Sequence, residues 1–358
     1  MRVGIISAGA WGTALAKTLV ENGHDVAIWD HMKHVVHDIA QNHRNDRFLM
    51  GVKLPDGLHA SIDITDVAQN RDFIILATPT LYIKNVLYDI ASLPDVRAGI
   101  PVCVVISKGF ISHGDDLYLL ADGVETVLPS VYKGMVVYVS GPSHAEEVAR
   151  GKLTGLIAAC NSGTNAIKVR ELLSGGSLLV FSSLDRVGVQ VCGAVKNVIA
   201  ISFGMLDAFM EFTDYFGDNT ESLLLAAGLN EIQLLGTTMG ATHPETFTSI
   251  AGVGDLDVTC RSRHGRNRRF GREIIIDRIL ERFKDIEDII EHIDYIGYLP
   301  EGIVAAKYVY MLTKRANVRL PICETVYRIL NRSVEPADGL SDIVAQLGKN
   351  AGLGNLQL

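Results

Sequence analysis

A short glycine-rich segment lies near the start of the chain. Ser7–Gly12 (SAGAWG) follows the apolar run Val3–Ile6 and leads into the helical pattern Trp11–Asn22. This order matches the fingerprint G-x-G-x-x-G, with a serine in place of the first glycine. Gly9 would let the backbone approach a pyrophosphate, and Gly12 would let helix and strand pack closely. We expect an NAD(P) site here; the alternative is an ordinary strand–helix turn.

One acidic residue stands where the same fingerprint places a ribose ligand. Asp30 follows the apolar run Val26–Trp29 and lies 23 residues after Ser7. A carboxylate at this position can accept hydrogen bonds from the adenine ribose of NAD and would repel the 2′-phosphate of NADP. We therefore expect Asp30 to favour NAD, and its replacement by Asn to raise the relative use of NADPH. The alternative is a solvated residue at a strand end, and the neighbouring His31 and Lys33 would blur the selectivity.

Two lysines have positions that suit acid–base chemistry. Lys196 lies in the otherwise apolar helical run Val195–Ile201, where a lysine is costly unless it is paired or functional. Lys108 precedes Gly109 at the carboxyl end of a predicted strand, where ligands of parallel sheets bind. A lysine whose pKa is lowered by burial or by a second ammonium group can protonate the oxygen of a ketone during its reduction. The alternatives are that Lys196 is an ordinary surface lysine of an amphipathic helix and that Lys108 is an ordinary loop lysine.

Further polar residues gather in the second half of the chain. Asp255 and Thr259 are four residues apart and would share one face of a helix, although Asp255 could instead cap that helix. Six arginines lie between Arg261 and Arg272, together with His264 and Asn267. Such a cluster predicts a phosphate or nucleic-acid site, or simply a solvated face.

The elements that position these residues follow from hydrophobic patterning. Apolar runs in the first 187 residues predict buried strands, which alternate with helical patterns and so indicate a parallel sheet of βαβ units. The predicted strands are Val3–Ile6, Val26–Trp29, Phe73–Ala77, Val102–Ile106, Val136–Val139, Leu156–Ala159 and Leu178–Phe181.

The second half of the chain has a helical hydrophobic pattern and few of the apolar runs that predict strands. The pattern predicts the helices Asp185–Met210, Asn219–Met239, Arg272–His292, Gly302–Lys314 and Ile322–Asn331. We therefore predict an α/β, Rossmann-like, dinucleotide-binding domain over residues 1–187 and an all-α substrate and catalytic domain over residues 188–358.

Composition narrows the classes of function. The 358 residues are enough for two domains, and 48% apolar residues with a net charge of −8 exclude global disorder. The acidity argues against a dedicated nucleic-acid binder. Five scattered cysteines without a C-x-x-C pair predict a reducing compartment, with no disulfide framework and no metal site. We expect neither a membrane span nor a signal peptide, because charges and the glycines at positions 4, 9 and 12 interrupt the apolar runs.

Longer stretches of the sequence resemble one family of dehydrogenases. The resemblance begins at Ser7–Ala16 (SAGAWGTALA) and continues in order along nearly the whole chain. The other matching segments are Asn45–Leu54 (NDRFLMGVKL), Ala77–Pro79, Ser107–Gly109, Gly141–Ala149 (GPSHAEEVA), Val195–Ala200 (VKNVIA), Gly217–Thr220 (GDNT), Ala251–Cys260 (AGVGDLDVTC), Arg266–Gly271 (RNRRFG) and Pro300–Gly302. By these motifs the chain resembles the NAD(P)-dependent glycerol-3-phosphate dehydrogenases.

The resemblance implies an activity and a set of site residues. It implies interconversion of dihydroxyacetone phosphate and glycerol 3-phosphate by hydride transfer with NAD(H) or NADP(H), in a cytoplasmic homodimer that serves glycerophospholipid metabolism. The implied catalytic residues are Lys196 as general acid/base, Lys108, Asp255 and Thr259. The implied substrate ligands are Lys108, Gly141, Ser143, Arg266 and Asn267, the last two at the phosphate. The implied cofactor ligands are Gly9, Ala10, Trp11, Gly12, Asp30, His31, Lys108, Ala145, Arg266, Leu299 and Glu301.

The chain departs from the family pattern at several places. Ser7 replaces a glycine, Gly265 replaces a common serine, and Ala227 replaces a common arginine. The acidic and aromatic segment 204–217 is longer than usual, and we expect it to form a lid or an interface. The arginines other than Arg266 are expected at helix starts and on the surface.

Two other functions remain open from the sequence. One is a related dehydrogenase of the 6-phosphogluconate or ketopantoate type. The other is a non-catalytic nucleotide-sensing or nucleic-acid-binding protein on the same fold, with the arginine cluster as its contact surface. The presence of Lys108, Lys196 and Asp255 favours the enzyme.

Overall fold

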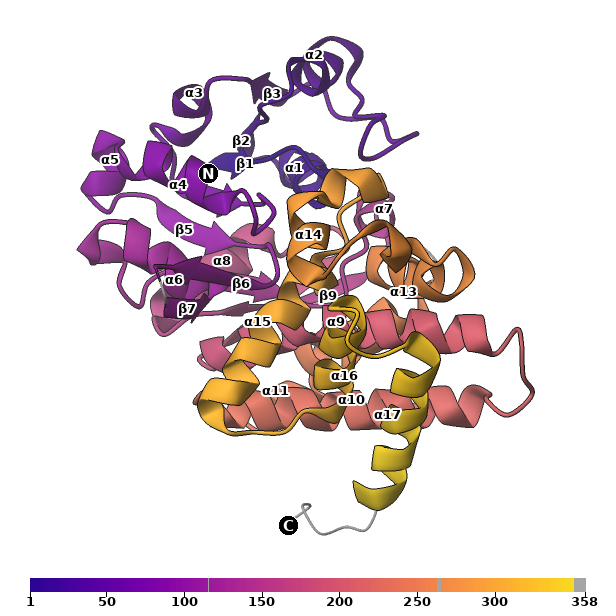
Figure 1. The fold of residues 1–358 in the computed structure, drawn as a ribbon. Helices are drawn as coiled ribbons and strands as arrows, with labels where there is room; N and C mark the ends of the chain where they lie inside the picture. Colours follow the sequence, from indigo (N-terminus) through magenta and orange to yellow (C-terminus); the bar gives the residue numbers. More distant parts are fainter. Residues whose placement is uncertain (115, 263–264, 351–358) are drawn as a thin grey trace. The chain divides into compact units, whose positions relative to one another are not determined.

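The chain divides into two compact units, residues 1–190 and 191–358. The structure is a computed structural model that describes residues 1–114, 116–262 and 265–350 (Figure 1). The division falls inside helix α9 (Arg186–Phe209), three residues after the predicted domain boundary.

The first unit is built on an eight-stranded, mostly parallel sheet. Its strand order is β10-β9-β8-β5-β4-β1-β2-β3. The strands are β1 (Arg2–Ile6), β2 (Asp25–Trp29), β3 (Leu58–Ser61), β4 (Phe73–Leu76), β5 (Val102–Val105), β8 (Val137–Ser140), β9 (Thr154–Ala159) and β10 (Leu178–Ser183). All seven predicted strands are present, and the predicted α/β class is confirmed.

Helices pack on this sheet and bury its central strands. They are α1 (Ala10–Glu21), α2 (Lys33–Asn42), α3 (Ile64–Ala68), α4 (Ile83–Ala91), α5 (Pro94–Arg97), α6 (Leu120–Val127), α7 (Ala145–Ala149) and α8 (Gly163–Leu173). Every residue of β4 is buried, as are four of the five residues of β1. Continuous apolar runs therefore correspond to strands covered on both faces.

One pair of strands departs from the predicted parallel sheet. β8 pairs antiparallel with β9, which in turn pairs parallel with β10. The segment that joins β8 to β9 contains the five-residue helix α7, which packs against α1. This segment does not carry the chain back along the sheet as a crossover helix would, so β9 runs opposite to β8.

Three strands were not predicted. β3 lies at the edge of the sheet and has the sequence LHAS, with one buried residue. β6 (Phe110–His113) and β7 (Asp116–Leu119) form a separate antiparallel pair. Strands at an edge or in an isolated pair do not need the long apolar runs by which buried strands are recognised.

The described part of the second unit consists of helices. They are α9, α10 (Asp218–Thr238), α11 (Glu245–Thr248), α12 (Asp255–Arg261), α13 (Arg266–Ile276), α14 (Ile286–Glu291), α15 (Glu301–Ala316), α16 (Pro321–Leu330) and α17 (Pro336–Asn350). This confirms the predicted helical class. α9 is long and apolar enough to cross a membrane by length and composition, but its apolar window is entirely buried in the protein, as in a core helix.

The single helix predicted over Arg272–His292 is wrong. α13 ends at Ile276, a short 3₁₀ turn follows, and α14 begins at Ile286. Arg278 has a left-handed backbone with a φ of 48°, which breaks the helix. Asp285 then caps α14 by accepting a hydrogen bond from the amide of Asp288 at 2.9 Å.

A buried carboxylate joins two helices of this unit. Glu231 on α10 accepts hydrogen bonds from the amides of Ile322 at 2.5 Å and Cys323 at 3.0 Å, in the first turn of α16. Burial raises the pKa of Glu231 to about 7, although the two amides act in the opposite direction. The Glu231 side chain therefore binds its proton more tightly in the folded protein than in the unfolded chain.

The free energy of unfolding is expected to depend on pH through Glu231. Because its folded-state pKa is raised, its stabilising contribution is present at low pH and is lost as pH rises through about 7. Between about pH 5.5 and 8.5 this amounts to about 2 kcal/mol. Urea unfolding should show a smaller pH dependence for Glu231→Gln than for the native protein. Glu291→Gln, at an exposed carboxylate, should leave the dependence unchanged, and equal slopes in all three proteins would contradict the assignment.

Candidate active site

The glycine-rich turn of the first unit has the geometry of a pyrophosphate cradle. Gly9 precedes α1 as its N-cap, and the space around its Cα is open, with Ser7 Oγ 4.0 Å from a Cβ built there. At Gly12 a Cβ would lie 2.3 Å from the carbonyl oxygen of Ser7, so the helix and the turn touch where only glycine fits. Ala10 and Trp11 form the first turn of α1 and are partly buried. These residues fit a dinucleotide at the N-terminus of the helix.

Asp30 and His31 differ sharply in exposure. Asp30 is 2% exposed, and its two oxygens accept hydrogen bonds from the amides of Ala8 at 2.9 Å and Met32 at 3.0 Å. The side chain of His31 is 71% exposed and has its Nδ1 3.3 Å from Asp30 Oδ1. The carboxylate thus faces the backbone of the turn, while the imidazole faces solvent.

The structure brings together the substrate residues expected in the first unit. Lys108 follows β5, and its Nζ donates a hydrogen bond to the carbonyl oxygen of Gly141 at 3.2 Å. Ser143 Oγ donates to the same oxygen at 3.0 Å. Gly141 has a φ of 141°, and a Cβ there would lie 2.7 Å from the carbonyl of Gly155, so glycine is required. Ala145 begins α7 immediately afterwards.

Lys196, Asp255 and Thr259 meet in the second unit. Lys196 lies on α9 and is 5% exposed, and its Nζ donates hydrogen bonds to Asp255 Oδ1 and, at 2.8 Å, to Thr259 Oγ1. Thr259 donates its own hydroxyl proton to the carbonyl of Asp255 at 2.6 Å. Gly254 is the N-cap of α12, so Asp255 is not the cap. The buried ammonium is therefore compensated by a buried carboxylate, as a charge in this environment requires.

A second set of hydrogen-bonded polar groups includes Asn197, the residue next to Lys196. Asn267 Nδ2 donates to Asn197 Oδ1 at 2.9 Å, and Asn267 Oδ1 accepts from the amide of Gly302 at 2.9 Å. Asn197 is 5% exposed, and its Nδ2 has no acceptor among the described residues. A buried donor left without a partner is costly and points to a ligand oxygen. Asn197 is thus a candidate site residue that sequence reasoning missed, although it lies next to Lys196 in the matching segment Val195–Ala200.

The arginine cluster separates into paired and unpaired side chains. Arg261 pairs with Asp257, Arg268 with Asp207, Arg269 with Glu273 and Arg272 with Glu211. Arg266, the first residue of α13, is exposed and has no ion pair or hydrogen bond among the described residues. Arg263 and His264 lie outside the described residues. Within the part of the cluster that is described, Arg266 is therefore the guanidinium available to an anion.

Acidic residues after and within the end of α9 pair with arginines of this cluster. Arg268 lies in the first turn of α13, as expected of a helix-start arginine, and its side chain is 19% exposed and pairs with Asp207 through two nitrogens. Asp207 belongs to the segment 204–217, whose first six residues continue α9. Glu211, in the same segment, lies 2.5 Å from Arg272. The acidic segment thus fastens α9 to α13, the helix that carries Arg266 and Asn267.

The two expected cofactor residues near the start of α15 are partly buried. Leu299 lies just before α15, and Glu301 is its first residue. Neither has a role that the described contacts define. Their assignment to the cofactor stays a prediction.

Close packing of helices sets the position of the asparagine pair. A Cβ built on Gly302 would lie 2.5 Å from the carbonyl oxygen of Asn197, and one built on Gly271 would lie 2.0 Å from that of Ile201. Glycine at these two positions therefore lets α15 and α13 touch the backbone of α9. This contact brings Asn267 within hydrogen-bonding distance of Asn197 on α9 and of the amide of Gly302 on α15.

Replacement of Gly302 by alanine is expected to disrupt this arrangement. The added methyl group must push α15 away from α9, which should lower the free energy of unfolding by about 1–3 kcal/mol and weaken substrate binding. Gly217→Ala is the control, because a Cβ at Gly217 meets no atom within 4 Å. Urea unfolding of both variants measures the difference. Equal stability of the two would contradict the packing argument.

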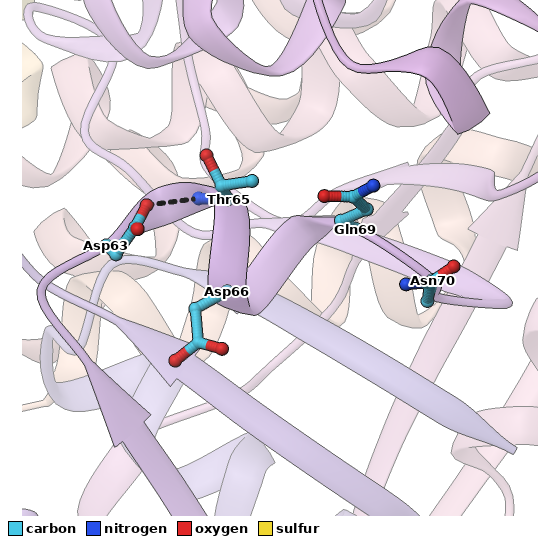
Figure 2. Close-up of a pocket in the computed structure, with 5 residues that line it drawn as sticks. All are labelled: Asp63, Thr65, Asp66, Gln69 and Asn70. Atoms are coloured by element: carbon cyan, nitrogen blue, oxygen red, sulfur yellow. Dashed lines mark hydrogen bonds between the residues drawn. The ribbon is translucent and has the colours of Figure 1, made fainter.

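A surface hollow elsewhere in the first unit is not a candidate. Figure 2 shows it at α3, lined by Asp63, Thr65, Asp66, Gln69 and Asn70. Asp63 uses its side chain to cap α3 by accepting a hydrogen bond from the amide of Thr65 at 2.9 Å. The lining comes from one short segment and carries two carboxylates, which would repel a phosphorylated ligand. None of the expected site residues lines it.

Comparison with known proteins gives one consistent result. Residues 2–166 match the model of the NAD-dependent glycerol-3-phosphate dehydrogenase N-terminus, and residues 185–341 match that of the C-terminus. A glycerol-3-phosphate dehydrogenase [NAD(P)+] of Treponema denticola is 51% identical over 96% of this chain and 98% of its own length. One from Bacillus subtilis is 35% identical over 96% and 94%.

A solved structure supports the same conclusion. The crystal structure of glycerol-3-phosphate dehydrogenase from Coxiella burnetii superposes with a TM-score of 0.82 at 29% identity, covering 96% of this chain and 98% of that one. The two family models cover both halves of the chain, and the curated relatives match nearly its full length. The chain therefore belongs to the NAD-dependent glycerol-3-phosphate dehydrogenase family.

Proposed function

We propose that this protein interconverts dihydroxyacetone phosphate and glycerol 3-phosphate by hydride transfer with NAD(H) or NADP(H). The observation that carries the proposal is the buried Lys196 ammonium held by Asp255 and Thr259. A bound nicotinamide supplies or accepts the hydride. The work left to the protein is to orient the substrate and to move one proton at its C2 oxygen.

Lys196 is the proposed general acid/base. Hydride addition to a ketone leaves negative charge on the oxygen, which must be protonated as it forms. Asp255 accepts a hydrogen bond from Nζ and holds it in place, and Nζ is the proposed proton donor during reduction. Thr259 accepts a hydrogen bond from Nζ and fixes its direction. In the oxidation of glycerol 3-phosphate the same nitrogen takes the hydroxyl proton back.

The phosphate and the remaining oxygens need separate ligands. Arg266 is exposed and lacks a carboxylate partner among the described residues, so its planar guanidinium can take two phosphate oxygens. Asn267 lies beside it and is fixed by Asn197 and Gly302. The Nδ2 of Asn197, which has no acceptor among the described residues, is the proposed donor to a substrate or cofactor oxygen. In the first unit, Lys108, Gly141 and Ser143 are proposed substrate ligands.

We assign the proposed roles to the two halves of the chain. Residues 1–187 bind the dinucleotide through Gly9, Ala10, Trp11, Gly12, His31 and Ala145. Residues 188–358 carry the general acid/base and the phosphate ligands, with Leu299 and Glu301 as further cofactor contacts. We also propose a homodimer in the cytoplasm, by analogy with the family.

A panel of ketone substrates tests the proposal against the related dehydrogenases. Purified protein should oxidise NADH or NADPH with dihydroxyacetone phosphate and should be far slower with unphosphorylated dihydroxyacetone and with 2-dehydropantoate. The reason is that Arg266 recognises a phosphate, which the other two ketones lack. Preferential turnover of 2-dehydropantoate would favour the ketopantoate type. Salt-sensitive binding of DNA or RNA, with no turnover of any ketone, would favour the non-catalytic alternative.

A further inference from the structure

Ser7 occupies a backbone conformation that serine rarely adopts. Its φ is 99°, in the region that glycine enters freely and other residues enter only at a cost. This is the position of the first glycine in the dinucleotide fingerprint. The chain therefore keeps the backbone shape of the turn without the residue that makes that shape easy. Other contacts must therefore stabilise the backbone conformation of Ser7.

Buried side chains hold both polar groups of the next residue. The amide of Ala8 donates to Asp30 Oδ2 at 2.9 Å. The carbonyl of Ala8 accepts from Asn45 Nδ2 at 2.7 Å and from Thr13 Oγ1 at 3.0 Å, and Asn45 Nδ2 also lies 2.8 Å from Thr13 Oγ1. A strained backbone persists only where its surroundings over-determine it. Here the three side chains come from three segments: the end of β2, the loop after α2, and α1.

The burial of Asp30 bears on its role. Thr13, Asp30 and Asn45 are 0%, 2% and 1% exposed. The second oxygen of Asp30 accepts from the amide of Met32 at 3.0 Å, so each oxygen already serves a backbone amide. A ribose hydroxyl would need an accessible oxygen, whereas the accessible group at this place is the His31 imidazole. The geometry of Asp30 suits support of the turn better than contact with the nucleotide.

We propose that Asp30, with Asn45 and Thr13, is a positioning residue that holds the Ser7–Ala8 turn in the shape required for NAD(P) binding. In this role Asp30 sets the affinity for NADH and NADPH together and does not discriminate between them. The hydrogen bonds of these three side chains to Ala8 offset the conformational cost of having serine, and not glycine, at position 7. The inference rests on the NAD(P)-binding function of the family and concerns residues of the first unit alone.

Binding titrations separate this role from that of a ribose ligand. The dissociation constants of NADH and NADPH are measured by nucleotide fluorescence, without turnover, for the native protein and for Asp30→Asn. Loss of the ionised carboxylate should weaken both nucleotides by a similar factor, on the order of tenfold, and leave their ratio unchanged. Asp25→Asn makes the same chemical change at an exposed carboxylate of β2 and should alter neither constant.

A double variant tests the link to Ser7. Ser7→Gly removes the conformational cost that Asp30 offsets, so Ser7→Gly/Asp30→Asn should recover most of the affinity that Asp30→Asn loses. Melting temperature should recover in parallel, which keeps the test valid if Asp30→Asn alone folds poorly. The two substitutions must therefore be strongly non-additive.

Three outcomes would overturn the inference. One is a rise in the relative affinity for NADPH in Asp30→Asn, as expected if Asp30 binds the ribose. Another is unchanged affinity for both nucleotides in that variant. The third is strictly additive effects of Ser7→Gly and Asp30→Asn. Absence of binding of either nucleotide to the native protein would instead refute the proposed function, so the two failures are distinguishable.

Discussion

Replacement of Lys196 by methionine is expected to lower kcat at least about 100-fold, the lower end of the contribution of general acid–base catalysis. Methionine keeps most of the apolar stem of lysine but cannot donate a proton to the developing alkoxide. The affinity for NADH should change little, because the glycine-rich turn lies in the other unit. Steady-state rates measure the first effect, and fluorescence titration of NADH measures the second.

The control for this experiment is an exposed lysine of the same unit. Lys314→Met removes a solvent-facing ammonium that lies 3.9 Å from Glu324 and should leave kcat near its native value. Because Lys196→Met leaves Asp255 buried without its cation, folding must be checked by circular dichroism and by NADH binding. A folded Lys196→Met protein with near-native kcat would exclude Lys196 and leave Lys108 as the next candidate.

Removal of the Arg266 guanidinium is expected to weaken transition-state binding of the phosphorylated substrate. Arg266→Ala should lose about 2–4 kcal/mol in kcat/KM for dihydroxyacetone phosphate, as for truncation of one partner of a charge pair. The loss should be small with unphosphorylated dihydroxyacetone, because that ketone has no group for Arg266 to bind. The comparison of the two substrates therefore isolates the contact with the phosphate.

Arg269 offers a matched control on the same helix. Its guanidinium is 63% exposed, pairs with Glu273 and lies over the ring of Tyr298. Arg269→Ala should reduce kcat/KM far less than Arg266→Ala. Equal losses with the phosphorylated and unphosphorylated ketones, or equal effects of the two arginine variants, would exclude the proposed role of Arg266.

Local patterns in the sequence were enough to place the buried core. The runs around β1, β2, β4 and β5 are apolar throughout because both faces of these strands are covered, and such runs are recognisable in isolation. Lys196 was recognisable for the same reason, as a charge inside an apolar helix. These features depend on a residue and its immediate neighbours.

Features that depend on distant partners could not be predicted in this way. The direction of β9 is set by the segment that precedes it, since buried strands have similar compositions in parallel and antiparallel pairs. The sequence could not separate Arg266 from Arg268, because the partner of Arg268 is Asp207, about sixty residues earlier. The left-handed backbone of Ser7 depends on Asp30 and Asn45 in the same way.

The most direct test of the proposed function is the oxidation of NADH, followed by its absorbance, when dihydroxyacetone phosphate is added to the purified native protein. From the buried Lys196 and Asp255 with Thr259 beside them, we expect steady turnover with glycerol 3-phosphate as the product, and loss of nearly all of that rate in Lys196→Met. NADPH is assayed in parallel, so that a preference for the phosphorylated cofactor is not mistaken for inactivity. A folded protein that binds either nucleotide but oxidises neither with dihydroxyacetone phosphate would contradict the proposal.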